Sequence, residues 1–108
     1  MIKEYNKLVR DKIPEIIEKD GKSCKTEILE DDKYIEMLDK KLSEELAEYY
    51  NDKSLEELAD VLEVLYAVAV ARGYSLEELE KLRVQKSMER GGFCKKILLK
   101  SVEDSRNG

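Results

Sequence analysis

The sequence predicts an all-α protein: an antiparallel bundle of about four helices, completed by homo-oligomerisation, with short extended segments at the connections. Three observations favour this fold class. Apolar residues recur every three or four positions, two Ser-Leu-Glu-Glu segments mark helix starts, and glycines follow the expected helix ends. A chain of 108 residues has room for one modest core. We therefore expect a single helical domain over residues 1–100 and a flexible tail over residues 101–108.

The first helix is predicted to be short. Asp11 is suited to cap its N-terminus, and Pro14 fits the first turn, where a missing N–H costs no hydrogen bond. Gly21 supplies a stop, which gives a helix over residues 12–20. Residues 22–30 break the helical period and suggest an extended connection.

The next helices have clearer starts and ends. Apolar residues at helical spacing predict a second helix from residue 31 or 32 to residue 50. The segment that begins at Ser54 is a capping box and predicts a third helix over residues 54–72. A second capping box, at Ser75, predicts a fourth helix that ends near residue 90. The second and third helices are therefore joined by a tight turn and run antiparallel.

The C-terminal part is predicted to be irregular. Gly91 and Gly92 end the fourth helical pattern. The apolar group at residues 97–99 is expected to lie against the bundle or to pair as a strand. Beyond it, the polar residues have no helical period, which is typical of a frayed tail.

The third predicted helix is apolar nearly all round, since Glu63 is the only charged residue between Val61 and Ala71. A helix of this kind needs cover on every side, and one small chain cannot easily supply it. We therefore expect a homo-oligomer, either a homodimer or a homotetramer.

Composition narrows the function. The 25 acidic residues outnumber the 20 basic ones, and the net charge of −5 disfavours nucleic-acid binding. The charged N-terminus and the absence of a long apolar run predict a cytoplasmic protein with no membrane partner. Because the chain has no histidine, catalysis by Ser-His-Asp or Cys-His groups is excluded. Any metal ion must be a hard cation bound by oxygen.

Eight acidic residues lie between Glu44 and Glu63, and Lys53 is the only basic residue among them. The tight turn brings the end of the second helix beside the start of the third, so four carboxylates converge there. Such a group repels itself unless it takes up protons or binds a divalent cation, and magnesium prefers oxygen ligands. Manganese is the expected substitute. The four converging residues are Glu45, Glu48, Glu57 and Asp60.

A purely structural interpretation explains some of these acids. Glu57 is the capping-box residue, and Glu44 taken alone is an ordinary helix former on a surface. Asp60 is harder to explain in this way, because aspartate is a mediocre helix former and this one shares a helical row with Val64 and Ala67. Asp60 is therefore the strongest single candidate for a functional carboxylate.

Three motifs resemble a known family. Glu44-Glu45-Leu46-Ala47-Glu48 and the following Glu57-Leu58-Ala59-Asp60 are similar to the double acidic motif of MazG-like all-alpha NTP pyrophosphatases. The segments at residues 6–14 and 86–93 resemble a subgroup described as phosphoribosyl-ATP pyrophosphohydrolase-like. The resemblance covers about residues 5–98. One departure is the separation of Glu48 from Glu57 by only eight residues, which is shorter than usual in the superfamily.

The resemblance implies a magnesium-dependent enzyme that hydrolyses a nucleoside triphosphate, canonical or not, to the monophosphate and pyrophosphate. Carried over by position, the four converging carboxylates bind magnesium, Glu45 also acts in catalysis, and Glu44 assists or orients water. Basic residues that contact a triphosphate would come from the N-terminal segment or from the fourth predicted helix. Ordinary surface solvation explains each of these residues equally well. These candidates are Lys7, Arg10, Lys12, Lys86 and Arg90.

Two alternatives stay open. A phosphoribosyl-ATP pyrophosphohydrolase would use the same carboxylates on a different nucleotide. A non-catalytic helical oligomerisation or binding module would use the apolar third helix as an interface and carry the acids only as surface charge. Metal-dependent release of pyrophosphate distinguishes an enzyme from such a module.

Overall fold

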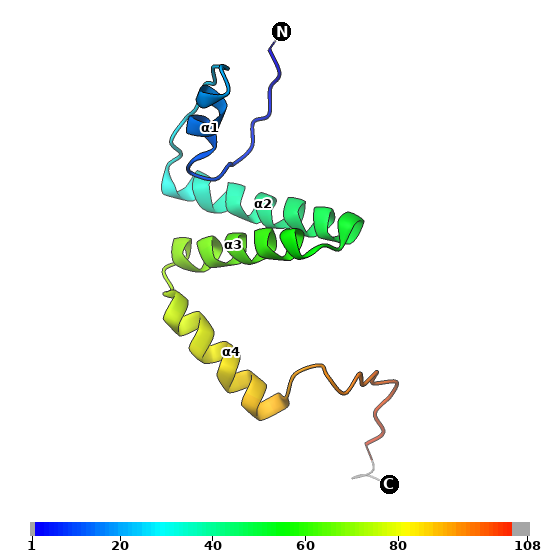
Figure 1. Cartoon of the computed structure of the whole chain (residues 1–108). Coiled ribbons are helices and arrows are strands. Elements are labelled where there is room, and N and C mark those ends of the chain that lie inside the picture. Colours follow the sequence, from blue (N-terminus) through cyan, green and yellow to red (C-terminus); the bar gives the residue numbers. More distant parts are fainter. Residues whose placement is uncertain (1, 105–108) are drawn as a thin grey trace. The chain divides into compact units, whose positions relative to one another are not determined.

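The computed structural model describes residues 2–104, and this part of the chain is all-α (Figure 1). No strand occurs among the described residues. The chain divides into two compact units, Met1–Leu76 and Glu77–Gly108. The all-α fold class with four helices is confirmed, while the single domain over residues 1–100 stays a prediction. The helices are α1 (Ile13–Lys19), α2 (Asp31–Asp52), α3 (Leu55–Ala71) and α4 (Leu76–Arg90).

Helix α1 occupies the predicted segment but begins differently. The predicted cap at Asp11 is wrong: Lys12 is at the N-cap position, and no side chain caps the helix. A backbone turn takes the place of the cap, since the N–H of Ile13 donates to the carbonyl of Arg10 at 3.0 Å. Gly21 follows the helix with φ of 81°, a left-handed conformation that favours glycine, as the sequence predicted. Residues 22–30 are neither helix nor strand.

Helices α2 and α3 form an antiparallel hairpin, and they are the helix pair that packs together in the first unit (Figure 1). The predicted cap of α3 is confirmed, because the N–H of Glu57 donates to Oγ of Ser54 at 3.2 Å. Helix α2 continues two residues beyond the predicted end at Tyr50, to Asp52. It ends where Lys53 adopts a left-handed conformation with φ of 54°. Two residues therefore connect the helices.

The interior of the hairpin is small. Leu38 on α2 and Val64 on α3 are its buried apolar side chains among the described residues, and Glu45 is buried with them. At the half of the hairpin away from the turn, a guanidinium nitrogen of Arg72 lies 2.8 Å from a carboxylate oxygen of Asp39. Packing and this one ion pair thus connect the two helices away from the turn.

The outer face of α3 is apolar and exposed. Leu58, Leu62 and Val70 have exposed fractions of 48%, 46% and 57%. The predicted all-round apolar character of this helix is therefore a feature of the folded surface. The structure describes no second copy of the chain, so homo-oligomerisation stays a prediction.

In the second unit, α4 ends before Gly91, which has φ of 83°. Its start after Ser75 agrees with the second capping-box prediction. The apolar group at residues 97–99 does not pair as a strand, and its three side chains are 78%, 80% and 74% exposed. Of the predicted tail, residues 101–104 form no helix, and residues 105–108 lie outside the described residues.

No helix in the described part of the chain is long and apolar enough to span a membrane.

Candidate metal centre

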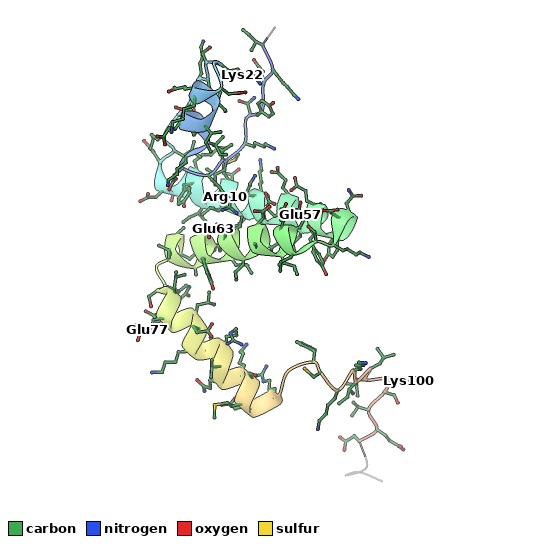
Figure 2. All side chains as sticks on the ribbon, viewed as in Figure 1. Arg10, Lys22, Glu57, Glu63, Glu77 and Lys100 are labelled. Carbon is green, nitrogen blue, oxygen red and sulfur yellow. The ribbon has the colours of Figure 1, made fainter. Side chains whose placement is uncertain are left out.

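The hairpin turn brings the predicted acidic residues into two overlapping groups, and the predicted convergence of four differs in that Glu48 is not grouped with Glu57 and Asp60. Figure 2 shows Glu57 in the half of α3 that is nearest the turn. The C-terminal half of α2 packs beside this part of α3. Carboxylate oxygens from both helices gather here in two groups, and within each group one oxygen per residue lies within 4.8 Å of the others. Glu45 belongs to both groups. One group is Glu44, Glu45 and Glu48, and the other is Glu45, Glu57 and Asp60. These five residues are called the acidic cluster below.

Glu45 is the central residue of the cluster and also its most buried one. Its side chain is 9% exposed, which is unusual for a glutamate. One oxygen, Oε1, lies 3.2 Å from Nζ of Lys41, one helical turn earlier on α2. The other oxygen, Oε2, is buried without a hydrogen-bond partner. A buried carboxylate oxygen that lacks a partner carries a desolvation penalty, which a bound cation would offset.

Glu57 repeats this feature from the other helix. Its backbone N–H completes the cap at Ser54, as the structural interpretation of the sequence proposed. Its side-chain Oε2, however, is buried without a hydrogen-bond partner. The capping role therefore accounts for the backbone of Glu57 and leaves one carboxylate oxygen unexplained.

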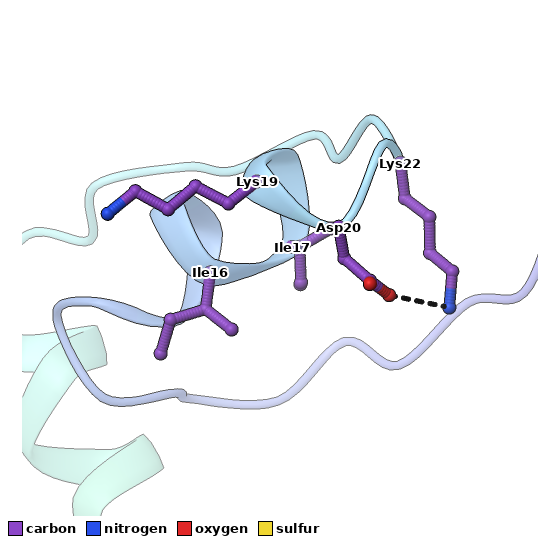
Figure 3. Close-up of a pocket in the computed structure, with 5 residues that line it drawn as sticks. All are labelled: Ile16, Ile17, Lys19, Asp20 and Lys22. Carbon is purple, nitrogen blue, oxygen red and sulfur yellow. Dashed lines mark ion pairs between the residues drawn. The ribbon is translucent and has the colours of Figure 1, made fainter.

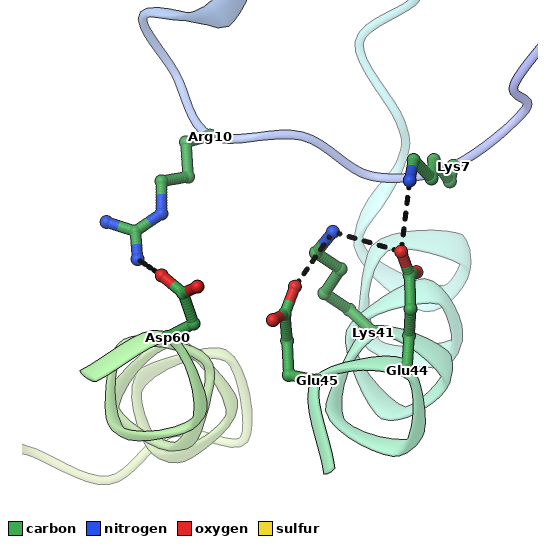
Figure 4. Close-up of polar contacts among 6 residues, drawn as sticks. All are labelled: Lys7, Arg10, Lys41, Glu44, Glu45 and Asp60. Carbon is green, nitrogen blue, oxygen red and sulfur yellow. Dashed lines mark hydrogen bonds and ion pairs between the residues drawn. The ribbon is translucent and has the colours of Figure 1, made fainter. Parts of the chain in front are cut away.

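Asp60 continues the row of Val64, but it does not lie in the core as its helical position suggested. Its side chain is 39% exposed, and Oδ1 accepts a hydrogen bond of 2.6 Å from a guanidinium nitrogen of Arg10 (Figure 4). Glu48 is exposed.

Three basic side chains reach into the cluster. Arg10 contacts Asp60, and Nζ of Lys7 donates to Oε1 of Glu44 at 3.1 Å (Figure 4). Lys41 lies 3.2 Å from Glu45 and 3.6 Å from Glu44. The sequence had assigned Lys7 and Arg10 to substrate phosphates, and it missed Lys41. The signal was present, since residues three and four positions apart share a helix face.

The carboxylates respond to these surroundings in opposite ways. Burial raises the pKa of Glu45, and repulsion from Glu48 and Asp60 adds to this against the attraction of Lys41. Loss of solvation and the same two acids raise the pKa of Glu57. Burial would also raise the pKa of Glu44, but the hydrogen bond from Lys7 and the charge of Lys41 outweigh it and lower that pKa. The two lysines beside Glu44 therefore outweigh its burial, whereas Lys41 alone does not outweigh the burial of Glu45.

The donor set fits a hard divalent cation. All the groups are carboxylates, the five acids face three basic side chains, and this leaves an excess of two negative charges when all are ionised. Opposite ligands of magnesium are about 4.2 Å apart, because each oxygen lies about 2.1 Å from the ion. Three oxygens around one octahedral ion include at least two pairs at adjacent positions, which are about 3.0 Å apart, so oxygens up to 4.8 Å from one another would have to close by as much as about 1.8 Å when the ion binds.

The remaining predicted substrate residues lie outside the α2–α3 hairpin. Lys12 is exposed at the start of α1. Lys86 and Arg90 are exposed on α4 in the second unit. Their role in phosphate binding stays a prediction.

Two surface hollows occur elsewhere, and neither includes a residue of the acidic cluster. One lies beside α1 and contains the ion pair of Asp20 and Lys22, 3.6 Å apart (Figure 3). Asp20 is the one acidic residue that lines this hollow, and it is already paired with Lys22, so the hollow is a poor candidate for a cation site. The other is lined by Glu77, Glu80, Lys81 and Val84.

Comparison of the chain with protein-family models, curated proteins and solved structures gave no match. The resemblance to MazG-like pyrophosphatases therefore rests on the motifs of this sequence.

Proposed function

We propose that this chain is a magnesium-dependent nucleotide pyrophosphohydrolase, with the acidic cluster as its metal centre. The observation that carries the proposal is the buried, unpartnered Oε2 of Glu45, where the two carboxylate groups overlap. A cluster of surface acids without function would expose its oxygens to water. The burial of this oxygen supports a cation as its missing partner.

The proposed ligands are Glu45, Glu48, Glu57 and Asp60, with manganese as a substitute metal. When bound, the ion would neutralise phosphate charge and activate a water molecule for attack. Water adds to the α-phosphorus of the nucleotide, the bond to the β-phosphate breaks, and pyrophosphate leaves. Glu44, which forms ion pairs with Lys7 and Lys41, is proposed to orient that water.

The substrate is a nucleoside triphosphate, with noncanonical nucleotides included. Lys7 and Arg10 are the basic residues nearest the cluster and are proposed to contact the phosphates, with Lys12, Lys86 and Arg90 as further candidates. Phosphoribosyl-ATP is the alternative substrate within the same chemistry. A screen of both kinds of nucleotide, with pyrophosphate and phosphate measured separately, distinguishes them.

The test of the enzyme is pyrophosphate release from a panel of nucleotides with magnesium, with manganese and with excess EDTA. Activity that depends on the metal supports the proposal. Full activity in EDTA, or no release from any nucleotide by a folded protein that binds the metal, would leave the non-catalytic oligomerisation module as the better explanation.

The exposed apolar face of α3 supports a homo-oligomer, dimer or tetramer, as part of the same proposal. Its exposed residues repeat at helical spacing, so a second copy of the hairpin offers a matching surface. Light scattering after size-exclusion chromatography tests this, with Leu62→Lys as the variant expected to dissociate. A monomeric wild-type protein would contradict the homo-oligomer. The face consists of Leu58, Leu62, Leu65, Tyr66 and Val70.

A further inference from the structure

Two long-range ion pairs connect the N-terminal segment to the acidic cluster. Lys7 reaches Glu44, which is 37 residues away on α2, and Arg10 reaches Asp60, which is 50 residues away on α3 (Figure 4). Neither basic residue lies in a helix. The segment that carries them therefore crosses both helices of the hairpin at the cluster.

Arg10 is directed at a residue that the proposed metal centre also needs. Oδ1 of Asp60 accepts the 2.6 Å hydrogen bond from Arg10, and the same carboxylate offers an oxygen within 4.8 Å of oxygens of Glu45 and Glu57. A guanidinium at this distance neutralises the carboxylate and repels a second cation. Arg10 therefore competes with a metal ion for the Asp60 carboxylate, and its positive charge lowers the affinity of that carboxylate for the ion.

We infer that Arg10 is an exchangeable counter-ion: it pairs with Asp60 in the metal-free protein and moves to the substrate's phosphates when Asp60 binds the metal. The inference rests on the proposed function and deepens it, because it makes metal binding and phosphate binding interdependent through one side chain. Arg10 keeps an anionic partner in both states, first a carboxylate and then a phosphate, and guanidinium binds both well.

The exposure of the pair suits such an exchange. The side chains of Arg10 and Asp60 are 56% and 39% exposed, so water screens their attraction and lowers the cost of separating them. A buried pair would hold too firmly to release. The competition with metal is therefore expected to change metal affinity by only about two- to fivefold.

The inference predicts that one substitution has effects of opposite sign. Arg10→Gln removes the competing charge, so Mn²⁺ in the absence of nucleotide should bind about two- to fivefold more tightly. The same change removes a phosphate contact, so tripolyphosphate with Mg²⁺ should bind about tenfold more weakly. If Arg10 only held the N-terminal segment against the hairpin, its replacement would not strengthen Mn²⁺ binding and weaken tripolyphosphate binding at the same time.

The matched control is Arg72→Gln. Arg72 also pairs with an aspartate of the hairpin, Asp39 at 2.8 Å, with similar exposure of both side chains, but away from the acidic cluster. Free Mn²⁺ is measured by electron paramagnetic resonance, and tripolyphosphate binding by calorimetry. Arg72→Gln should leave both affinities at the wild-type value. Equal tightening of Mn²⁺ by both variants would indicate a general effect of charge and would overturn the inference.

A measurement on the wild-type protein makes the test independent of any change in stability of the variants. The side-chain Nε–H signals of Arg10 and Arg72 are followed by NMR while Mg²⁺ is added. The Arg10 signal should move towards that of a solvated arginine, and the Arg72 signal should stay. If Mg²⁺ binds and the Arg10 signal does not move, the exchange does not occur.

The outcomes separate the inference from the proposed function. Mn²⁺ binding that is equal in wild type and Arg10→Gln contradicts the exchange and leaves the metal centre intact. If neither protein binds Mn²⁺, the metal centre itself is wrong, and the exchange fails with it.

Discussion

The two halves of the α2–α3 hairpin contain similar charged residues but balance them differently. Away from the turn, one aspartate, Asp39, meets one arginine, Arg72. Near the turn, five carboxylates meet three basic side chains, and two buried oxygens have no partner. The pair of Asp39 and Arg72 is balanced in charge, whereas the excess of carboxylates near the turn supports our proposal that a cation binds there. The half away from the turn therefore joins the helices, and the half near the turn contains the candidate metal centre.

The largest expected effect is the loss of turnover in Asp60→Asn. The change keeps the size of the side chain and removes a negative ligand, so pyrophosphate release should fall by about 100-fold or more, as when charge-stabilising groups are removed from other active sites. Asp39→Asn, the matched change in the other half, should retain the wild-type rate. Rates are compared at saturating magnesium. Equal losses in both variants would remove the distinction between the two halves.

Leu38→Ala tests where the stability of the hairpin resides. Leu38 is 3% exposed and is one of the two buried apolar side chains, so its truncation should destabilise the protein by about 2–5 kcal/mol. Asp60→Asn should change the stability of the protein in EDTA by no more than about 1 kcal/mol, because the relief of repulsion within the acidic cluster offsets the loss of the exposed pair with Arg10. Denaturant unfolding in EDTA measures both. Strong destabilisation by Asp60→Asn would make this residue structural.

Metal should stabilise the protein through the turn half alone. Magnesium at about 100 times its dissociation constant should add about 2.7 kcal/mol to the free energy of unfolding, because it binds the folded state. The accompanying rise in Tm should disappear in Glu45→Gln and persist in Asp39→Asn. A rise that survives in Glu45→Gln would place the ion elsewhere.

The smallest expected effect concerns the cap of α3. Ser54→Ala removes the acceptor for the N–H of Glu57 and should destabilise the protein by about 1 kcal/mol. Ser54→Asp, which also caps helices well, should restore the stability. If the cap also positions Glu57, metal affinity will fall in Ser54→Ala and recover in Ser54→Asp.

Local sequence signals predicted the helices well because their causes are local. Ser54 and Gly73 act on their own helix ends, so the segment around each of them determines the boundary. The exception was Asp11, where a backbone turn from Arg10 to Ile13 replaced the expected side-chain cap. Residue type alone does not distinguish between these two ways to begin a helix.

The acidic cluster was predictable in part for the same reason. A tight turn places the end of one helix beside the start of the next, so the proximity of Glu45 and Asp60 followed from helix boundaries. The pairing of Lys7 and Arg10 with the cluster was not predictable, because contacts over 37 and 50 residues depend on where an irregular segment runs. Local sequence patterns do not determine the path of this N-terminal segment.

The connection at Lys53 and Ser54 determines how the carboxylates of α2 and α3 face each other. Only these two residues separate α2 from α3, and Lys53 already takes a left-handed conformation to close the turn. One inserted residue that extended α3 would rotate the carboxylates after it by about 100° and shift them by about 1.5 Å along the axis. Glu57 and Asp60 would then face away from Glu45. The length of this loop therefore determines whether the proposed centre can form at all, since the carboxylates of the two helices face each other only at this spacing.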